Sequence, residues 1–331
     1  MKLSLRVGAL FLSLLLLFSF ASCDLSSLQN FIPNGGDESY TPPTYTEVIA
    51  DAFTDCYGDQ LSPNEKAVYD AILAAEAGEN EFSVVFPETL SLCKNRAPTT
   101  SEQNEAKDKM TYWISNALLA VWLDAPALFW LDFSDYSYSC TFAQGNDGVI
   151  SVTDLVVKIG LRVEGQAAAT RAAALSAALS AIKPYGASDA ELVRSINSLL
   201  AKAVEYDLEA DDRATAAGAL VDGRCVCEGY AHAFQLLCQK AGIDCVCILG
   251  DATSNGKTEG HMWNAVRIDG VWYYCDPTWN DTTSSVKYLL VGGDTKGHED
   301  TFDKTHVPEN SLGKSKAFAL PVVSKTAYEK K

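Results

Sequence analysis

The sequence predicts an α+β fold in which one helix packs on an antiparallel sheet, preceded by an N-terminal region that also mixes helices with strands. Apolar residues at spacings of three and four in residues 231–241, with Gly242 as a natural stop, indicate the helix. The sheet is indicated by Asp269-Gly270 between two apolar runs, the strongest short signal for a two-residue hairpin turn. The helix begins near Cys227, so we expect the candidate catalytic residues in this half of the chain.

The composition is that of an ordinary globular protein. The chain has 331 residues, of which 47% are hydrophobic and 21% are charged. This balance excludes wholesale disorder, collagen-like repeats and a multi-span membrane protein. The 26 basic and 43 acidic residues give a net charge of −17. Such a chain repels phosphate backbones, so we expect no nucleic-acid partner.

The first residues have the pattern of a secretory signal. Lys2 and Arg6 precede an apolar run at residues 7–20 that is too short to span a bilayer comfortably. The cysteine that follows Ala-Ser resembles the processing site of bacterial lipoproteins, which implies a signal peptide at residues 1–22 and a lipidated Cys23. We therefore expect an extracytoplasmic protein at the cell surface, anchored to the membrane at Cys23. Ordinary secretion is the alternative.

Three segments follow the predicted signal peptide. Residues 23–46 hold several Pro, Gly and Asn residues and few branched aliphatic ones, so we expect a flexible tether. Residues 47–164 are predicted to form the N-terminal α+β region, and residues 165–331 the domain that carries the motifs described below. Lengths of this order suit two modest domains.

Capping boxes and apolar patterns place the helices and strands. Ser62-Pro63-Asn64-Glu65 combines a capping box with proline at the first helical position, so a helix starts there. The other predicted helices cover residues 102–123, 165–182 and 189–205, and the predicted strands cover residues 82–86, 128–131, 136–142 and 149–163.

Cys227 falls on the first turn of its predicted helix. Unpaired backbone N–H groups and the positive end of the helix dipole lie there, and both favour a thiolate over a thiol. The same N–H groups can stabilise an oxyanion on an attacked carbonyl, and Gly229 removes a side chain where a substrate approaches. Taken alone, however, Cys225 and Cys227 are more often half-cystines or buried thiols.

The hairpin register predicts a pair of polar residues on one face of the sheet. If Ile268 faces Val271, then Trp263 faces Asp276 and His261 faces Thr278. His261 and Asp276 then become diagonal neighbours about 7–8 Å apart at the backbone, within side-chain reach. An Asp beside a His holds it in one tautomer and stabilises its cation. Together with Cys227 they form a nucleophile, a base and an orienting group, although a single His or Asp in a strand is more often structural.

For the other candidate residues, we predict structural roles. His232 lies about 140° round the helix from Cys227 and points elsewhere. His298 and His306 lie in a segment rich in Gly, Asp and Lys, which predicts a surface loop. Three tryptophans favour an aromatic core over the lining of a substrate cleft, namely Trp263, Trp272 and Trp279.

The ten cysteines do not predict a metal site. Cys225 with Cys227, and Cys245 with Cys247, lack the gap of two to four residues typical of structural zinc ligands, so we expect no metal. Outside the cytoplasm disulfides can form, but their pairing is open from sequence.

Three motifs in order resemble the transglutaminase-like superfamily. They are Cys-x-Gly-Tyr-Ala at residues 227–231, His-x-Trp-Asn at 261–264 and Asp-Pro-Thr-Trp at 276–279, within a match over about 189–293. The resemblance implies a papain-like arrangement with Cys227 as nucleophile, His261 as base and acid, and Asp276 as its orienter. It prefers Cys227 to Cys225, because the family's cysteine precedes x-Gly-Tyr. It leaves Tyr206 as a guess for the oxyanion side-chain donor, and no calcium or other cofactor is expected.

These features predict a cysteine enzyme that attacks amide bonds of a peptide or protein through a thioester on Cys227. Hydrolysis is favoured over cross-linking because water is the abundant acceptor. The alternatives are a non-catalytic surface binding module that keeps the fold and a metal- or redox-binding protein. The oligomeric state is open.

Overall fold

The structure is a computed structural model, and it describes residues 21–24, 56–309, 311 and 315–329. Of the predicted signal peptide (residues 1–22) and tether (residues 23–46), it describes only the backbone of the short strand β1 (Ala21–Asp24). The side chain of Cys23, the predicted site of lipidation, lies outside the described residues. In the described part of the chain, no helix has the length and apolarity needed to cross a membrane.

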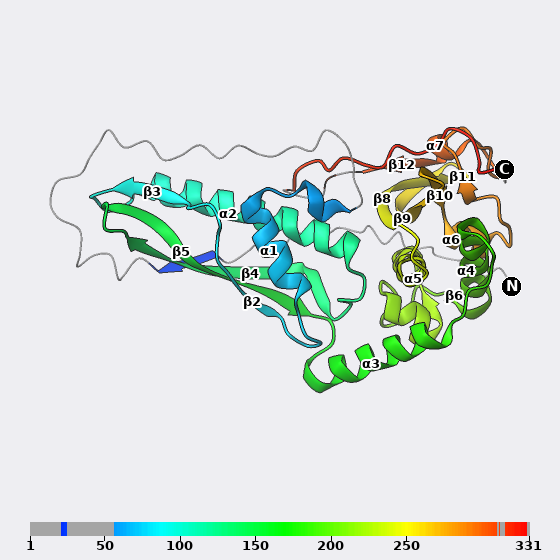
Figure 1. Cartoon of the computed structure of the whole chain (residues 1–331), viewed down its shortest axis with the longest axis horizontal. Coiled ribbons are helices and arrows are strands. Elements are labelled where there is room, and N and C mark those ends of the chain that lie inside the picture. Colours follow the sequence, from blue (N-terminus) through cyan, green and yellow to red (C-terminus); the bar gives the residue numbers. More distant parts are fainter. Residues whose placement is uncertain (1–20, 25–55, 310, 312–314, 330–331) are drawn as a thin grey trace, which may run out of the picture.

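The molecule is elongated, with an N-terminal half and a C-terminal half at its two ends and helix α3 leading from one to the other (Figure 1). In the N-terminal half, a sheet with the order β1-β4-β5-β2, in which β3 also pairs with β5, lies against two helices. Its elements are α1 (Pro63–Leu73), β2 (Glu81–Val84), β3 (Ser91–Lys94), α2 (Thr100–Asp124), β4 (Leu131–Gln144) and β5 (Val149–Leu161).

Most of the predicted elements of this half are confirmed, with two differences. The predicted capping box at Ser62 and Glu65 is present at the start of α1. The strand predicted at residues 128–131 is wrong, because this segment forms turns before β4 begins at Leu131. Its apolar side chains are buried all the same, and a short buried run has the same pattern in a turn as in a strand. Strand β3 was not predicted.

The C-terminal half contains a five-stranded antiparallel sheet with the order β11-β10-β9-β8-β12. Helix α5 packs against β8 and β9 of this sheet. The elements are α3 (Gly165–Ala181), α4 (Asp189–Ala203), β6 (Glu205–Tyr206), β7 (Arg224–Cys225), α5 (Cys227–Lys240), β8 (Cys245–Ser254), β9 (Lys257–Ile268), β10 (Val271–Cys275), α6 (Pro277–Thr282), β11 (Leu289–Val291), α7 (Phe302–Thr305) and β12 (His306–Pro308). The predicted mixture of a nucleophile helix with an antiparallel sheet is confirmed.

The two halves share buried contacts behind the start of α5. The Tyr57 hydroxyl donates to the backbone carbonyl of Cys247 in β8 at 2.7 Å. The indole N–H of Trp122, near the end of α2, donates to Glu228 Oε1 in the first turn of α5 at 3.0 Å. The first contact joins the N-terminal half to the sheet, and the second joins it to the helix on which the predicted nucleophile lies.

The hairpin register is confirmed only as far as Cys275. Ile268 pairs with Val271, and the ladder continues to Asn264 opposite Cys275. The next predicted pairs do not form, because Asp276 is the N-cap of α6 and Pro277 occupies the first helical position. Proline has no N–H to donate to a ladder and suits the first turn of a helix, so the strand ends there.

The cysteines are mostly thiols. Cys140 is disulfide-bonded. Free thiols are present at Cys56, Cys93, Cys225, Cys227, Cys238, Cys245, Cys247 and Cys275. Cys227 is therefore available for chemistry.

Candidate active site

Cys227 is the first residue of α5, as the sequence predicts. The N-cap is Val226, and no side-chain hydrogen bond caps the first turn. The backbone N–H groups of that turn and the positive end of the helix dipole therefore act directly on the sulfur and on a carbonyl next to it. Cys227 is half-buried, whereas Cys225, two residues earlier, is fully buried.

Gly229 has a steric role that differs from the expected one. A Cβ at this position would lie 2.5 Å from Cys225 Cβ and 2.7 Å from the carbonyl oxygen of Arg213. The glycine therefore lets α5 start directly against β7, and the proposed clearance for substrate is not needed to explain it. The Cys-x-Gly spacing is a packing requirement of this helix start.

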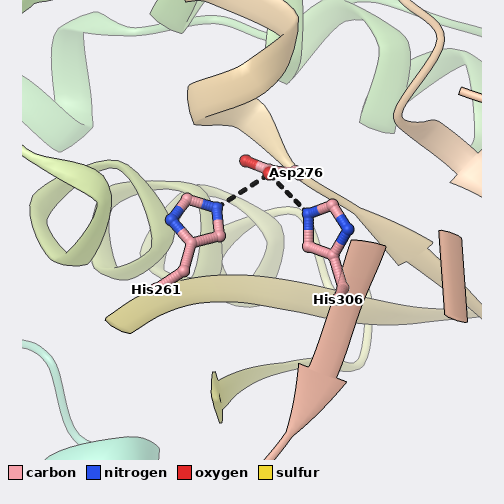
Figure 2. Close-up of side chains that lie close together, drawn as sticks. All are labelled: His261, Asp276 and His306. Atoms are coloured by element: carbon pink, nitrogen blue, oxygen red, sulfur yellow. Dashed lines mark hydrogen bonds and ion pairs between the residues drawn. The ribbon is translucent and has the colours of Figure 1, made fainter. Parts of the chain in front are cut away.

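His261 extends from β9 and meets Asp276 at the start of α6 (Figure 2). His261 Nε2 and Asp276 Oδ2 are 2.8 Å apart, and both side chains are buried. Asp276 Oδ1 accepts a hydrogen bond from the backbone N–H of Trp279 at 3.0 Å. The predicted His–Asp contact is present, although a helix N-cap supplies the aspartate and the expected strand pair does not.

A second histidine shares the same carboxylate oxygen. His306 Nε2 lies 3.1 Å from Asp276 Oδ2, on the side opposite His261 (Figure 2). The prediction of a surface loop for His306 is wrong, because β12 pairs with the edge of β8 and buries the residue to 1% exposure. His298 is exposed, as predicted.

Burial and the shared carboxylate shift the pKa values of the two histidines in opposite directions. Burial alone would lower the pKa of His261, but the charge and hydrogen bond of Asp276, together with a hydrogen bond to Cys227, raise it to about 10. Burial alone would raise the pKa of Asp276, but the two histidines hold it below its usual range. Burial outweighs the contact with Asp276 in His306 and lowers its pKa. At neutral pH, His261 is therefore a cation beside Cys227, and His306 is neutral.

Cys227 and His261 open into the same cleft, which has a volume of about 280 Å³. Its other lining residues are Tyr206, Ala252, Ser254, Lys257, Glu259, Gly260, Thr278, Trp279 and Thr282. Trp263 and Trp272 belong to the buried core, as predicted, but Trp279 lines the cleft. The three predicted residues thus come together, with Asp276 behind His261 and away from solvent.

A family model for the transglutaminase-like superfamily matches residues 179–277. The match contains Cys227, His261 and Asp276. Residues 179–277 therefore form a transglutaminase-like segment of the chain. The assignment fits the observed mixture of helix and antiparallel sheet around the site.

The similar proteins each match less than half of the chain. The mouse (Mus musculus) protein named kyphoscoliosis peptidase is 33% identical over 141 residues, which are 37% of this chain and 21% of that protein. A crystal structure of a TGase is 10% identical with a TM-score of 0.30, covering 44% of this chain and 51% of that one. The periplasmic domain of TgpA from Pseudomonas aeruginosa is 17% identical with a TM-score of 0.26, covering 43% and 62%. The matched segment thus spans about a fifth of the curated relative.

Tyr206, the guessed oxyanion donor, lies at the cleft of the transglutaminase-like core. Its ring stacks on Tyr230 at a centroid distance of 6.5 Å. Burial raises the pKa of Tyr206, and the neighbouring Cys227 adds to the rise, so the hydroxyl keeps its proton. The residue has the position and the protonation state that a hydrogen-bond donor to the cleft requires.

The remaining candidates lie away from the cleft or in its walls. His232 is buried and contacts Trp122, as expected for a structural residue. Among the described residues, the one group able to hold a metal ion is His261, Asp276 and His306, whose ligand atoms lie within 4.8 Å of one another. In this group both imidazoles use Nε2 to contact Asp276, so an ion would have to replace two hydrogen bonds.

Proposed function

We propose that the chain is an extracytoplasmic cysteine enzyme that attacks amide bonds and more often hydrolyses than cross-links them. One observation carries the proposal: Cys227 at a helix start and a cationic His261 line the same cleft, with Asp276 buried behind the imidazole. This order of groups is the one that nucleophilic acyl transfer requires.

The first half of the reaction forms a thioester. The Cys227 thiolate adds to the amide carbonyl, and the N–H groups of the first turn of α5 stabilise the oxyanion. The His261 imidazolium gives its proton to the amide nitrogen, the C–N bond breaks, and the amine leaves. Tyr206 is the proposed additional donor to the oxyanion.

The second half releases the acyl group. Neutral His261 takes a proton from water, the hydroxide adds to the thioester carbonyl, and the C–S bond breaks to give a carboxylic acid and the thiolate. An amine in place of water would give a new amide. Water is far more abundant, and the curated relative is named a peptidase, so hydrolysis of a peptide or protein is the preferred outcome.

The location is part of the same proposal. A signal peptide at residues 1–22 and lipidation of Cys23 would place the enzyme at the outer face of a membrane, where peptides and proteins of the surface are accessible. Globomycin inhibits the peptidase that processes bacterial lipoproteins. Mass spectrometry of the protein tests this part. The protein from treated cells should retain residues 1–22, and the protein from untreated cells should carry the mass of a lipid on Cys23.

The activity is tested first by the reactivity of the sulfur. Iodoacetamide near pH 6, followed by peptide mapping, should label Cys227 far faster than the buried thiols. In His261→Ala the rate should fall about 100-fold, because an ordinary thiol is only about 0.3% thiolate at that pH. The matched control is His298→Ala, an exposed histidine outside the cleft, which should label like the wild type. Slow labelling that is unchanged in His261→Ala would leave a non-catalytic binding module as the better reading.

The acyl step is tested by trapping. Incubation with mixtures of candidate peptides should give an acyl adduct on Cys227, detected by mass spectrometry, and none in Cys227→Ser. Decay of the adduct to free acid identifies a hydrolase. Decay to an amide only when an amine is added identifies a cross-linking enzyme.

A further inference from the structure

We propose that His306 is a positioning residue of the Cys227–His261 pair: by donating Nε2–H to Asp276 Oδ2, it fixes the carboxylate against His261. The inference rests on the proposed function for its catalytic meaning. It names a residue from outside the matched residues 179–277, on the short edge strand β12.

The hydrogen bonds of Asp276 leave little freedom for its carboxylate. Oδ1 accepts from the backbone N–H of Trp279 at 3.0 Å, and Oδ2 faces His261 Nε2 at 2.8 Å and His306 Nε2 at 3.1 Å. Without His306, the carboxylate could rotate about its bond to Cβ and lose its alignment with His261. Two donors on one oxygen and a third on the other fix the plane of the group.

Aromatic rings hold His306 in the orientation that this role requires. Its ring stacks on Phe302 at 3.9 Å between centroids, with an angle of 10° between the planes. The ring centroids of Trp279 and Trp263 lie 4.5 Å and 5.2 Å from that of His306. The side chain is fully buried, so the orientation of Nε2 is set by packing.

The tautomer is set by the carboxylate. Asp276 is ionised and its Oδ2 can only accept, so the 3.1 Å contact requires a proton on Nε2 of His306. Thr305 Oγ1 lies 2.9 Å from Nδ1, but its one proton also faces the carbonyl oxygens of Thr301 and Phe302, so this contact does not decide the tautomer. Packing alone does not require a histidine here, because a phenyl ring would fill the same space. The hydrogen bond to Asp276 does.

The titratable and charged groups around this unit come from several elements. Asp276 and His261 contact His306 directly, and the Tyr288 ring lies 6.1 Å away. On the cleft side, His261 faces Cys227, with Lys257 and Glu259 of its own strand also lining the cleft. Of these groups, Asp276 is the one that contacts Nε2 of both histidines.

The test compares two variants of His306. In His306→Gln the amide N–H can reach the place of Nε2, whereas His306→Met fills the space without a donor. Two quantities are measured: the pH dependence of Cys227 alkylation, and the titration of the His261 ring by ¹⁵N NMR. Few ring signals need to be assigned in the NMR spectrum, because the chain has four histidines. We expect His306→Gln to keep the wild-type profile. We expect His306→Met to lose roughly tenfold or more in alkylation rate, as for a hydrogen bond to a charged group, and to titrate at lower pH.

Two results for His306→Met would contradict the proposal. A wild-type profile in His306→Met would overturn the proposal, and so would a titration shifted to higher pH, which would show that His306 only competes for the charge of Asp276. Phe302→Leu is the packing control: it removes the stacked ring but not the hydrogen bond, so it should lower the melting temperature and leave the titration of His261 in place. If His306→Met fails to fold, His306→Phe fills the space of the ring without a donor and should shift the titration in the same direction.

The NMR readout also separates this inference from the proposed function. If Cys227 forms no acyl adduct in the wild type, the proposed function fails. The dependence of the His261 titration on residue 306 would still confirm or overturn the positioning role.

Discussion

Gly229 and Cys225 lie so close that a Cβ on residue 229 would come within 2.5 Å of the Cys225 Cβ. The contact joins the first turn of α5 to the preceding strand β7. It therefore helps to fix where α5, and with it Cys227, begins. Together with the Arg213 carbonyl, this contact explains the glycine of the Cys-x-Gly motif.

Gly229→Ala should displace the start of α5. The new methyl group also meets the Arg213 carbonyl at 2.7 Å, and backbone cannot move away as a flexible side chain can. We expect a loss of about 1–3 kcal/mol in the free energy of unfolding, as for overpacked cores, and slower alkylation of Cys227. Urea unfolding with peptide-mapped labelling measures both. Gly260→Ala is the steric control, since a Cβ there meets nothing within 4 Å, and it should keep wild-type stability.

Asp276→Asn should destabilise the protein most between about pH 4 and 6.5. His261 has a pKa raised to about 10, so its contribution is complete below the unfolded value near 6.5 and is lost as the pH rises through 10. Asp276 has a lowered pKa, so its contribution is complete above the unfolded value near 3.9 and is lost on acidification. Both describe one ion pair, and its removal from a buried site costs about 3 kcal/mol.

The measurement is urea unfolding of Asp276→Asn and the wild type at pH 5 and pH 9. Asparagine is also a good N-cap, so the variant keeps the start of α6 and removes the charge. The stability gap should be wide at pH 5 and narrow at pH 9. An equal gap at both values would show that the charge of the pair does not contribute. His298→Gln should show no gap at either value.

The sequence predicted which candidate active-site residues lie together, but not the backbone geometry that brings them together. The Asp-Gly turn fixed the hairpin register as far as Cys275, and the period of two placed His261 and Asp276 on one side. The signal that was undervalued is Pro277, which ends the strand and makes Asp276 a helix cap. The side chain still reaches His261 because an N-cap residue projects from the same corner of the sheet.

His306 could not have been found from local pattern. It lies 30 residues after Asp276, and β12 is only three residues long, too short to show a period. The Gly- and Asp-rich residues before it do form loops and turns, as their composition predicts. Only the pairing of β12 with β8 brings this histidine under the cleft, and such non-local pairing leaves no mark in one sequence.

Glu228→Gln should stabilise the protein at alkaline pH. Burial raises the pKa of Glu228 to about 7, although Arg162 and the Trp122 N–H favour its charged form. The folded pKa lies above the unfolded value of about 4.3, so the wild type loses stability as the pH rises from there through 7, and glutamine removes this loss. The gain should be about 1–2 kcal/mol at pH 8 and vanish at pH 4.5. The amide oxygen can still accept from Trp122. Thermal unfolding at the two pH values measures it, and a gain at pH 4.5 as large as at pH 8 would contradict the assignment.

The purified, reduced protein should contain no stoichiometric zinc. His261, Asp276 and His306 are close enough to ligate an ion, but both histidines already contact Asp276 Oδ2 through Nε2, at 2.8 and 3.1 Å. An ion would have to replace both contacts and fit between buried rings, while a catalytic zinc site keeps an open coordination position. Elemental analysis by mass spectrometry of protein prepared without chelator measures the content. One equivalent of zinc that is lost in His306→Gln would show instead that the three residues form a metal site, and His261 would then be a ligand and not the proton carrier of a thioester mechanism.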